Sequence, residues 1–278
     1  MIRKIIACAD IHIRNIQRLG ETKELLSKFA SKCREECAGF AKDEVRIVVC
    51  GDLFTQKIEI SNESNLLAAS FIDDLNQIAP TIVVVGNHDM LMNNKDRVDS
   101  ITPLFIMSKF PDAVYLDMNL GYKSGCEEDD NIVWCLYSSC DDFALTPSDI
   151  AEAKTKYGND KTYVGLFHGS VVGAKNAAGF KMDAGLSYDS FDGCDFVICG
   201  HIHKCQDIGK AVRPIVYCGS LIQQNNGESL HDHGYIVWDV QAKTYNFKEL
   251  ENNDYGFYQF SINSIEDLKN NQEKILNL

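Results

Sequence analysis

Five short apolar runs in the sequence each end in aspartate, asparagine or histidine, and this pattern constrains the fold more than any other feature. The run Val83–Val85 is followed at once by Gly86, Asn87, His88 and Asp89. The other four ends are Asp10-Ile11-His12, Gly51-Asp52, His168-Gly169 and Gly200-His201-Ile202-His203. Ligands of α/β sheets bind beyond the carboxyl ends of the strands. We therefore expect these polar side chains to meet at one edge of a sheet.

The rest of the chain alternates short β-rich runs with helical patterns, which is typical of an α/β sandwich. Helical spacing of apolar residues predicts a helix over Thr22–Ala41. Ser61 and Thr146 are predicted to cap helices that end near Ile78 and Tyr157. Strands are expected at Ile2–Ala9, Val45–Cys50, Thr81–Val85, Ile132–Tyr137, Thr162–Phe167, Asp195–Cys199, Ile215–Cys218 and Tyr235–Val240. The acidic run Glu127–Asp130 is expected to be a solvated loop.

The character of the sequence changes after Val240. Phe257–Ile262 is predicted to be a strand, and Ser264 is predicted to cap a helix that reaches Leu278. One strand and one short helix cannot form a core of their own, so they either pack on the main domain or begin a second one. We therefore divide the chain into a domain of residues 1–250 and a C-terminal strand–helix extension of residues 251–278.

Composition narrows the class of protein. The net charge of −13 argues against broad attraction to nucleic acid or an anionic membrane, although it leaves room for a local basic patch or a metal site. No apolar run approaches the roughly 20 residues that a membrane span needs. Eleven cysteines, an odd number with no C-x-x-C pair, are expected to be free thiols of a reducing cytosol. We therefore predict a cytoplasmic protein.

The polar strand ends have the chemistry of a metal site. Taken singly, each motif could be a turn or a surface histidine, but five of the seven histidines lie in these segments. Carboxylate, amide oxygen and imidazole, with no thiolate among them, suit Mn, Fe, Zn or Mg. Two such ions about 3.5–4 Å apart clamp the attacking and leaving oxygens of a displacement at phosphorus. The set therefore indicates a dinuclear metal centre.

The order of the motifs, D-x-H, G-D, G-N-H-D, H and G-H-x-H, resembles the calcineurin-like metallophosphoesterase superfamily over residues 1 to about 240. The resemblance implies a β-sandwich of two mixed sheets flanked by helices, in four αββα layers. It implies one metal on Asp10, His12 and His203, a second on Asn87, His168 and His201, and Asp52 as the bridge between them. His88 would stabilise the transition state or protonate the leaving oxygen, and Asp89 would hydrogen-bond His88 and set its tautomer.

Finer features resemble the SbcD family of double-strand-break repair nucleases, which has bacterial, phage and eukaryotic members. The second motif reads GDLF and the third GNHD, unlike the GDxxDRG and GNHE of protein serine/threonine phosphatases. The stretches YCGSLIQQNNGE and HGYIVWDV and the tail FKELENNDYGFYQFSI also resemble that family. The tail would be the start of a truncated DNA-binding cap.

This second resemblance implies a nuclease of DNA repair and recombination that hydrolyses phosphodiesters by metal-activated hydroxide. It implies 3′→5′ exonuclease activity on duplex DNA and endonuclease activity on single strands. The cofactor would be two divalent ions, Mn²⁺ before Mg²⁺, Fe²⁺ or Zn²⁺. A homodimer and an SbcC-like ATPase partner are implied as well, with DNA as substrate and no membrane. A phage member would work in the cytoplasm of the host cell.

Two questions stay open at this level. Arg14 and Arg18 follow the first motif, where they would contact the phosphate backbone of DNA or simply form a solvated helix start. The activity could also be that of a small-substrate phosphodiesterase or phosphatase of the same superfamily. A scaffold that has lost catalysis is disfavoured, because the motif set is complete.

Overall fold

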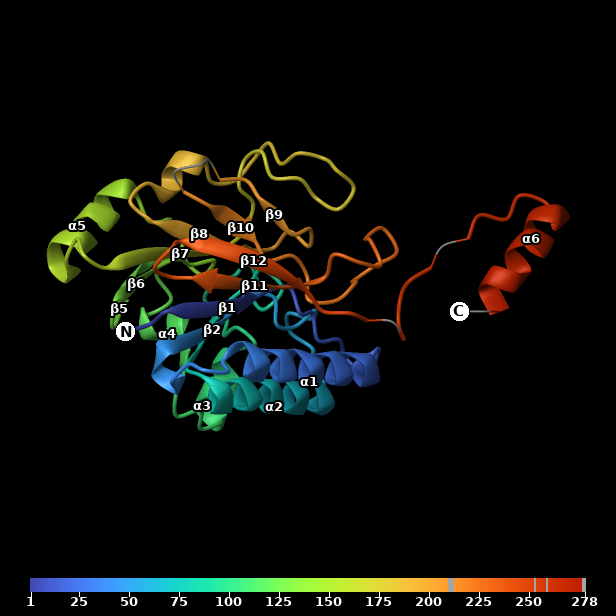
Figure 1. The fold of residues 1–278 in the computed structure, drawn as a ribbon, viewed down its shortest axis with the longest axis horizontal. Helices are drawn as coiled ribbons and strands as arrows, with labels where there is room; N and C mark the ends of the chain where they lie inside the picture. Colours follow the sequence, from blue (N-terminus) through green and yellow to red (C-terminus); the bar gives the residue numbers. More distant parts are fainter. Residues whose placement is uncertain (210–212, 253, 259, 277–278) are drawn as a thin grey trace.

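Two six-stranded mixed sheets form the centre of the molecule (Figure 1). The computed structural model describes residues 1–209, 213–252, 254–258 and 260–276. The first sheet has the order β12-β11-β1-β2-β3-β4, in which β1 to β4 pair in parallel and β11 and β12 pair antiparallel. Its strands are β1 (Lys4–Cys8), β2 (Val45–Cys50), β3 (Thr81–Val84), β4 (Ala113–Tyr115), β11 (Gly234–Asp239) and β12 (Thr244–Glu249).

The second sheet has the order β5-β6-β7-β8-β10-β9. Its four inner strands pair in parallel, and the two outer strands pair antiparallel to their neighbours. The strands are β5 (Gly125–Asp129), β6 (Ile132–Tyr137), β7 (Thr162–His168), β8 (Phe196–Gly200), β9 (Gln206–Asp207) and β10 (Ile215–Tyr217). Parallel pairing in both sheets brings the carboxyl ends of several strands to the same side.

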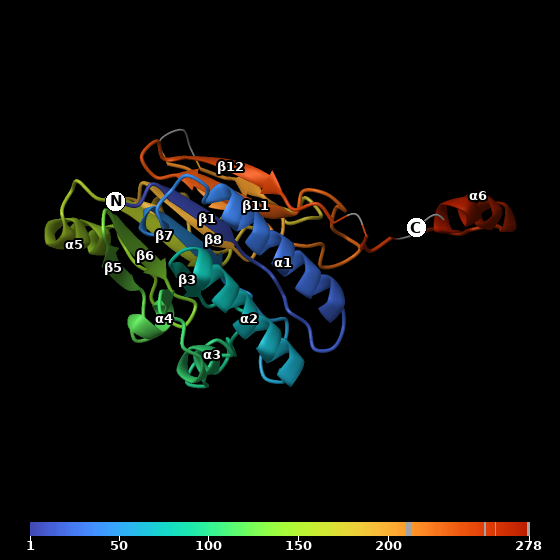
Figure 2. The ribbon, with the colours of Figure 1, turned by 60° about the horizontal axis from the view of Figure 1, so that its bottom comes forward.

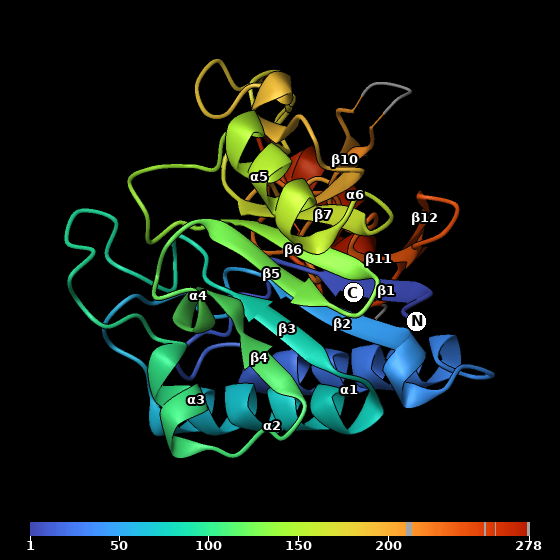
Figure 3. The ribbon, with the colours of Figure 1, turned by 90° about the vertical axis from the view of Figure 1, so that its left-hand side faces the viewer.

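Helices cover the outer face of each sheet, as the side view of Figure 3 shows. α1 (Leu19–Glu36) and α2 (Asn62–Ile78) lie side by side along the first sheet (Figure 2), and α5 (Pro147–Tyr157) lies on the second. The shorter elements are α3 (Thr102–Met107), α4 (Leu116–Asn119) and the 3₁₀ turns η1 (Lys42–Glu44) and η2 (Tyr188–Phe191). The four-layer sandwich that the resemblance implied is therefore confirmed.

Alternation of side chains along each strand explains the layers. Ile5 and Ala7 of β1 belong to the core between the sheets, whereas Ile6 and Cys8 pack against the helices. Strands buried on both faces read as continuous apolar runs, which is why the sequence reveals them so clearly. Between the sheets, Phe196 stacks on Trp238 with ring centroids 4.2 Å apart.

Most of the predicted boundaries agree with the structure. The Ser61 and Thr146 hydroxyls accept bonds from the Ser64 and Asp149 amides, as expected of N-caps. Helix α1 begins three residues before the predicted start, because Arg18 turns the chain with a φ of 56°. All eleven cysteines are free thiols, as predicted. None of the described helices is long and apolar enough to cross a membrane.

Two expectations were wrong. The acidic run is no loop, since Glu127–Asp129 lies in β5, where it pairs with β6. Phe257–Ile262 is not a strand in its described residues, because the Phe257 backbone is bonded to a side chain instead of a neighbouring strand. Its amide donates to Gln223 Oε1 (2.7 Å), and its carbonyl accepts from Gln223 Nε2 (3.4 Å).

Helix α6 (Ile265–Leu276) lies away from the sandwich in Figure 1. Its Asp267 amide donates to the Ser264 hydroxyl over 3.0 Å, which is the predicted cap. The predicted end of this helix, Leu278, lies outside the described residues. Ile265 and Leu268 are exposed, so these two side chains bury little apolar surface. The division of the chain at residue 250 stays a prediction.

Candidate metal centre

The two sheets are joined by hydrogen bonds at the edge where β1, β2, β7 and β8 end. His168, at the end of β7, contacts the Cys50 carbonyl at the end of β2 through Nδ1 (2.8 Å). The His201 amide, just after β8, donates to both carboxylate oxygens of Asp10, each at 3.0 Å. Residues that are far apart in the sequence thus share one buried edge, as the strand-end pattern predicted.

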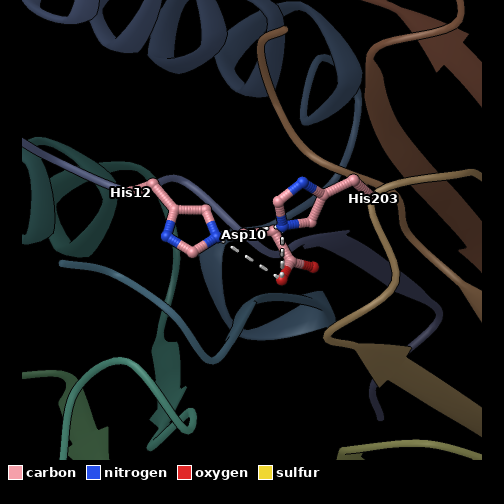
Figure 4. A group of neighbouring side chains, drawn as sticks. All are labelled: Asp10, His12 and His203. Atoms are coloured by element: carbon pink, nitrogen blue, oxygen red, sulfur yellow. Dashed lines mark hydrogen bonds and ion pairs between the residues drawn. The ribbon is translucent and has the colours of Figure 1, made fainter. Parts of the chain in front are cut away.

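Asp10, His12 and His203 form the first group at this edge (Figure 4). The Nε2 atoms of the two histidines lie 3.0 Å apart. Asp10 Oδ1 lies 4.0 Å from His12 Nε2 and 3.7 Å from His203 Nε2. Figure 4 shows one ring nitrogen of His203 near the Asp10 carboxylate and the other directed away from it. Three ligand atoms therefore converge on one point.

A second group lies next to the first. His168 Nε2 is 3.1 Å from Asp52 Oδ2 and 3.2 Å from the amide oxygen of Asn87. His201 Nδ1 is 2.7 Å from the same amide oxygen. Asp52 Oδ2 also lies 3.7 Å from His12 Nε2 of the first group. Asp52 therefore stands between the two groups, where a bridging carboxylate would have to be.

The backbone at this edge is strained. Four non-glycine residues of the two groups have a positive φ: Asp10 (52°), His12 (54°), Asp52 (53°) and His201 (90°). Such backbone is uncommon for residues with a Cβ and persists only where the surrounding structure enforces it. The parallel strands and the hydrogen bonds between the sheets supply that enforcement.

Burial sets the charges of the two groups. It lowers the pKa of His12 to about 3 and that of His201 to about 4, so both imidazoles are neutral near pH 7. Burial also raises the pKa of Asp10 to about 6. For His168, the neighbouring Asp52 carboxylate outweighs burial and raises the pKa of the imidazole, while that of Asp52 falls.

The ligand atoms of the two groups fit divalent cations. Asp10 is fully buried, and its carboxylate lies 4.0 Å from His12 Nε2 and 3.7 Å from His203 Nε2. The His203 Nδ1 is engaged by a carboxylate, which leaves the Nε2 lone pair facing His12 and Asp10. Lone pairs that converge without a hydrogen between them are what a bound cation would satisfy. The donor set of carboxylate, amide and imidazole suits the ions that the sequence indicated.

His88 lies beside the two groups, but its partner differs from the predicted one. Its Nδ1 is 3.1 Å from the Thr55 carbonyl, and its amide donates to Asp52 Oδ1 over 2.7 Å. A carbonyl can only accept, so Nδ1 carries the proton and Nε2 is the ring atom open to a substrate. The ring centroid of His88 is 4.9 Å from that of His12.

Asp89 does not orient His88, and that prediction was wrong. Its fully buried carboxylate accepts from the amides of Leu53 (3.2 Å), Phe54 (2.8 Å) and Gly86 (2.9 Å). Burial raises its pKa to about 8. Asp89 therefore ties the turn after β3 to the loop after β2, and the Thr55 carbonyl sets the tautomer of His88.

The side chains of Arg14 and Arg18 both form hydrogen bonds within the chain. Arg18 binds both carboxylate oxygens of Glu21 (2.5 and 2.6 Å) and donates to the Gln223 carbonyl over 2.7 Å. Arg14 donates to the carbonyl of Gln224 over 2.6 Å. These bonds engage both guanidinium groups within the chain, so neither residue is part of a solvated helix start, and contact with a phosphate backbone stays a prediction.

Glu228 is a residue that the sequence reasoning missed. His203 Nδ1 donates to its carboxylate over 2.7 Å, and burial leaves the side chain only 4% exposed. Burial alone would raise the pKa of Glu228, but the His203 bond and the Gln224 amide lower it below its ordinary value. Glu228 closes the stretch YCGSLIQQNNGE, yet nothing in its spacing from His203 marks it as a partner.

A cavity of about 420 Å³ opens beside the first group. His203 and Glu228 line one side of it, and Tyr245 and Phe247 of β12 line another. The polar side chains of Gln206 and Asp207 in β9 also line the cavity. Of the candidate ligand residues, His203 lines this cavity, together with its partner Glu228.

Comparison with known proteins agrees with this geometry. The family model of the calcineurin-like phosphoesterases matches residues 3–205. The chain belongs to this family. Members are phosphoesterases with dinuclear metal centres, and the structure brings candidate ligand atoms together at this edge of the sheets.

Two relatives of this family member are viral. An uncharacterized protein of Acanthamoeba polyphaga mimivirus is 37% identical over 261 residues, which is 92% of this chain and 18% of that protein. A provisionally named phosphoesterase of Invertebrate iridescent virus 6 is 26% identical over 240 residues, or 84% and 75% of the two chains. The chain thus spans less than a fifth of the length of the mimivirus protein.

Among solved structures, a metallophosphoesterase from Sphaerobacter thermophilus aligns over 98% of this chain and 94% of its own. The identity is 16% and the TM-score is 0.38.

Proposed function

We propose that the protein is a dinuclear-metal phosphodiesterase that acts on DNA, a nuclease of the SbcD type. One observation carries the proposal: two groups of ligand atoms share a buried edge, with Asp52 between them and His88 beside them. The choice of DNA is supported by the motifs GDLF and GNHD and by the stretches between residues 217 and 240.

The ligand roles follow the two groups. Asp10, His12 and His203 would hold one ion, Asn87, His168 and His201 the other, and Asp52 would touch both. When bound, two divalent ions, Mn²⁺ in this proposal, supply Lewis-acid stabilisation of a phosphoryl oxygen and lower the pKa of water. The protein's own part is to hold the ligand atoms on rigid strand ends and, through burial, to keep the imidazoles of His12 and His201 neutral.

His88 is the proposed catalytic residue outside the ligand set. The Thr55 carbonyl holds its Nδ1 proton, so Nε2 is directed to the substrate side. In the imidazolium form, with a second proton on Nε2, the ring would stabilise negative charge on the phosphoryl group or pass that proton to the leaving oxygen. The bond from the His88 amide to Asp52 Oδ1 fixes this ring relative to the proposed bridge.

A small-substrate phosphodiesterase is the second candidate. The net charge of −13 and the internal bonds of Arg14 and Arg18 favour it, because they leave little positive charge for a long polyanion. The cavity beside His203 also has the size of a small ligand. The two candidates share a metal centre and differ in whether DNA is cut.

The location and the partners stay proposals. Leu66 of α2 and Ile106 and Met107 of α3 are more than two-thirds exposed, and such apolar side chains support self-association. Light scattering that finds only monomer at high concentration would exclude the homodimer. The SbcC-like ATPase and the cytoplasmic location rest on the resemblance and on the cysteine usage.

The decisive assay uses end-labelled duplex DNA with Mn²⁺, resolved at single-nucleotide steps. Wild type is compared with His88→Ala and Asp52→Asn, and with His231→Ala, whose exposed ring lies outside the centre. A ladder that shortens from the 3′ end, lost only in the first two variants, supports the nuclease. The second candidate is favoured if the DNA stays intact, even after an SbcC-like partner is added, while a small phosphodiester is hydrolysed in a reaction that needs His88.

A further inference from the structure

Glu228 is almost fully hydrogen-bonded within the protein. Its Oε1 accepts from His203 Nδ1 (2.7 Å) and from the Asn225 side-chain amide (2.7 Å), and its Oε2 accepts from the Gln224 backbone amide (2.8 Å). A carboxylate held by two donors of its own loop and by His203 cannot easily turn away. It therefore presents a fixed acceptor to the outer nitrogen of His203.

The same loop carries a second connection. Gln223 donates to the Glu228 carbonyl over 3.0 Å and exchanges two bonds with the backbone of Phe257. The guanidinium of Arg18 lies 4.4 Å from the centroid of the Phe257 ring and donates to the Gln223 carbonyl. Loop 223–228 thus lies between the metal centre and the segment that follows β12.

That segment, residues 251–252 and 254–258, is also fastened to α1. The Asn252 side chain donates to Glu21 over 3.1 Å, and the Tyr255 hydroxyl donates to Glu24 over 3.3 Å. Glu21 is the residue that Arg18 binds with two bonds. A continuous set of contacts therefore runs from this C-terminal segment through Gln223 and Glu228 to His203.

We propose that Glu228 is a positioning residue that fixes His203 in the tautomer with Nε2 free for a metal, and that loop 223–228 couples this metal to the seating of the C-terminal segment. The proposal rests on the metal centre of the proposed function but not on DNA as substrate. Carboxylates that accept from the outer nitrogen of a metal-binding histidine fix its ring and raise its basicity. Coupling between two sites is reciprocal, so the metal must also favour the seated segment.

The first test compares Glu228→Ala and Glu228→Gln with Glu249→Gln. Glu249 is the matched control because it pairs with His231 (3.4 Å) outside the metal centre. In two-bond ¹H–¹⁵N spectra of ¹⁵N-histidine-labelled protein without metal, His203 is expected as the Nδ1–H tautomer in wild type and as a mixture in Glu228→Ala. Glu228→Gln, whose amide oxygen still accepts from Nδ1, is expected to restore the wild-type tautomer.

Metal affinity is the second readout of the same variants. Calorimetric titration with Mn²⁺ is expected to show one of two binding events weakened about 10–100-fold in Glu228→Ala, less in Glu228→Gln and not at all in Glu249→Gln. A role in folding alone would change thermal stability without changing the tautomer. An unchanged His203 tautomer together with two unchanged binding events in Glu228→Ala would overturn the positioning role.

Hydrogen exchange of the peptide spanning residues 254–258 tests the coupling. Mn²⁺ is expected to slow this exchange in wild type and to have no effect in Glu228→Ala, and Gln223→Ala is expected to weaken the same binding event. An exchange rate of this peptide that Mn²⁺ leaves unchanged in wild type would overturn the coupling. If the wild-type protein binds two ions but leaves DNA intact, the nuclease proposal is wrong and this inference still holds. If the wild-type protein binds no metal, both are wrong.

Discussion

Adding one methyl group at Gly86 should disable the metal centre. A Cβ at this position would lie 2.2 Å from the Asp52 amide nitrogen, 2.2 Å from its Oδ1 and 2.8 Å from its Cγ. Part of the obstacle is backbone, and Gly86 cannot retreat freely because its own amide donates to Asp89. The Gly86→Ala substitution therefore acts on the residue that stands between the two ligand groups.

The size of the effect follows from these distances. Ordinary contact between heavy atoms begins at about 3.5 Å, so Asp52 would have to move by more than about 1 Å. Metal–ligand distances tolerate about 0.2 Å, so a displacement of this size removes Asp52 as a ligand. Overpacking of a rigid site costs about 1–3 kcal/mol of folding free energy, and we expect the upper part of that range.

The assay measures urea unfolding in EDTA and Mn²⁺ binding by calorimetry. Gly20→Ala is the matched control, because a Cβ at Gly20 in α1 meets no atom within 4 Å. This control should keep both binding events and gain up to about 1 kcal/mol of stability from helix propensity. If Gly86→Ala binds two ions with wild-type affinity, the placement of Asp52 as the bridge is refuted.

Two further predictions concern pH and metal removal. Burial raises the pKa of Asp117 to about 6, above the roughly 3.9 of an unfolded chain. The folded state therefore holds this proton more tightly, and the resulting stabilisation is fully present below about pH 4. It is lost as the pH rises through 6, and the loss is at most about 3 kcal/mol. Asp117→Asn should reduce the fall in stability between about pH 4 and pH 6 in urea unfolding in EDTA, and an unchanged slope would contradict the assignment. Adding Mn²⁺ at about 100 times its dissociation constant should stabilise wild type by about 2.7 kcal/mol for each ion bound. EDTA should reverse the gain, and Asp52→Asn should show little of it in thermal unfolding.

The sequence predicts the central strands well, for a physical reason. Val45–Cys50 is buried on both faces, so it reads as an unbroken apolar run with the boundaries that the structure has. The strand β12 was not predicted, because only Tyr245 and Phe247 of its residues are apolar and its pairing with β11 decides its conformation. Edge strands such as β5 and β12 depend on a neighbour that local patterns do not reveal.

The same limit applies to the site. The strand-end motifs placed Asp10, Asp52 and His168 on one edge, because parallel strands present their carboxyl ends together. The partner of Asp89 depends on how the loop after β2 folds back, which no spacing in the sequence encodes. Glu228 reaches His203 from a loop that is held by Gln223 and Phe257, so its role emerges only from the tertiary structure.

A pair of metal ions at the shared strand edge can be observed directly by anomalous diffraction from crystals soaked in Mn²⁺. We expect two anomalous peaks about 3.5–4 Å apart, one within reach of Asp10, His12 and His203, with the Asp52 carboxylate between them. A single peak, or two peaks away from Asp52, would contradict this expectation.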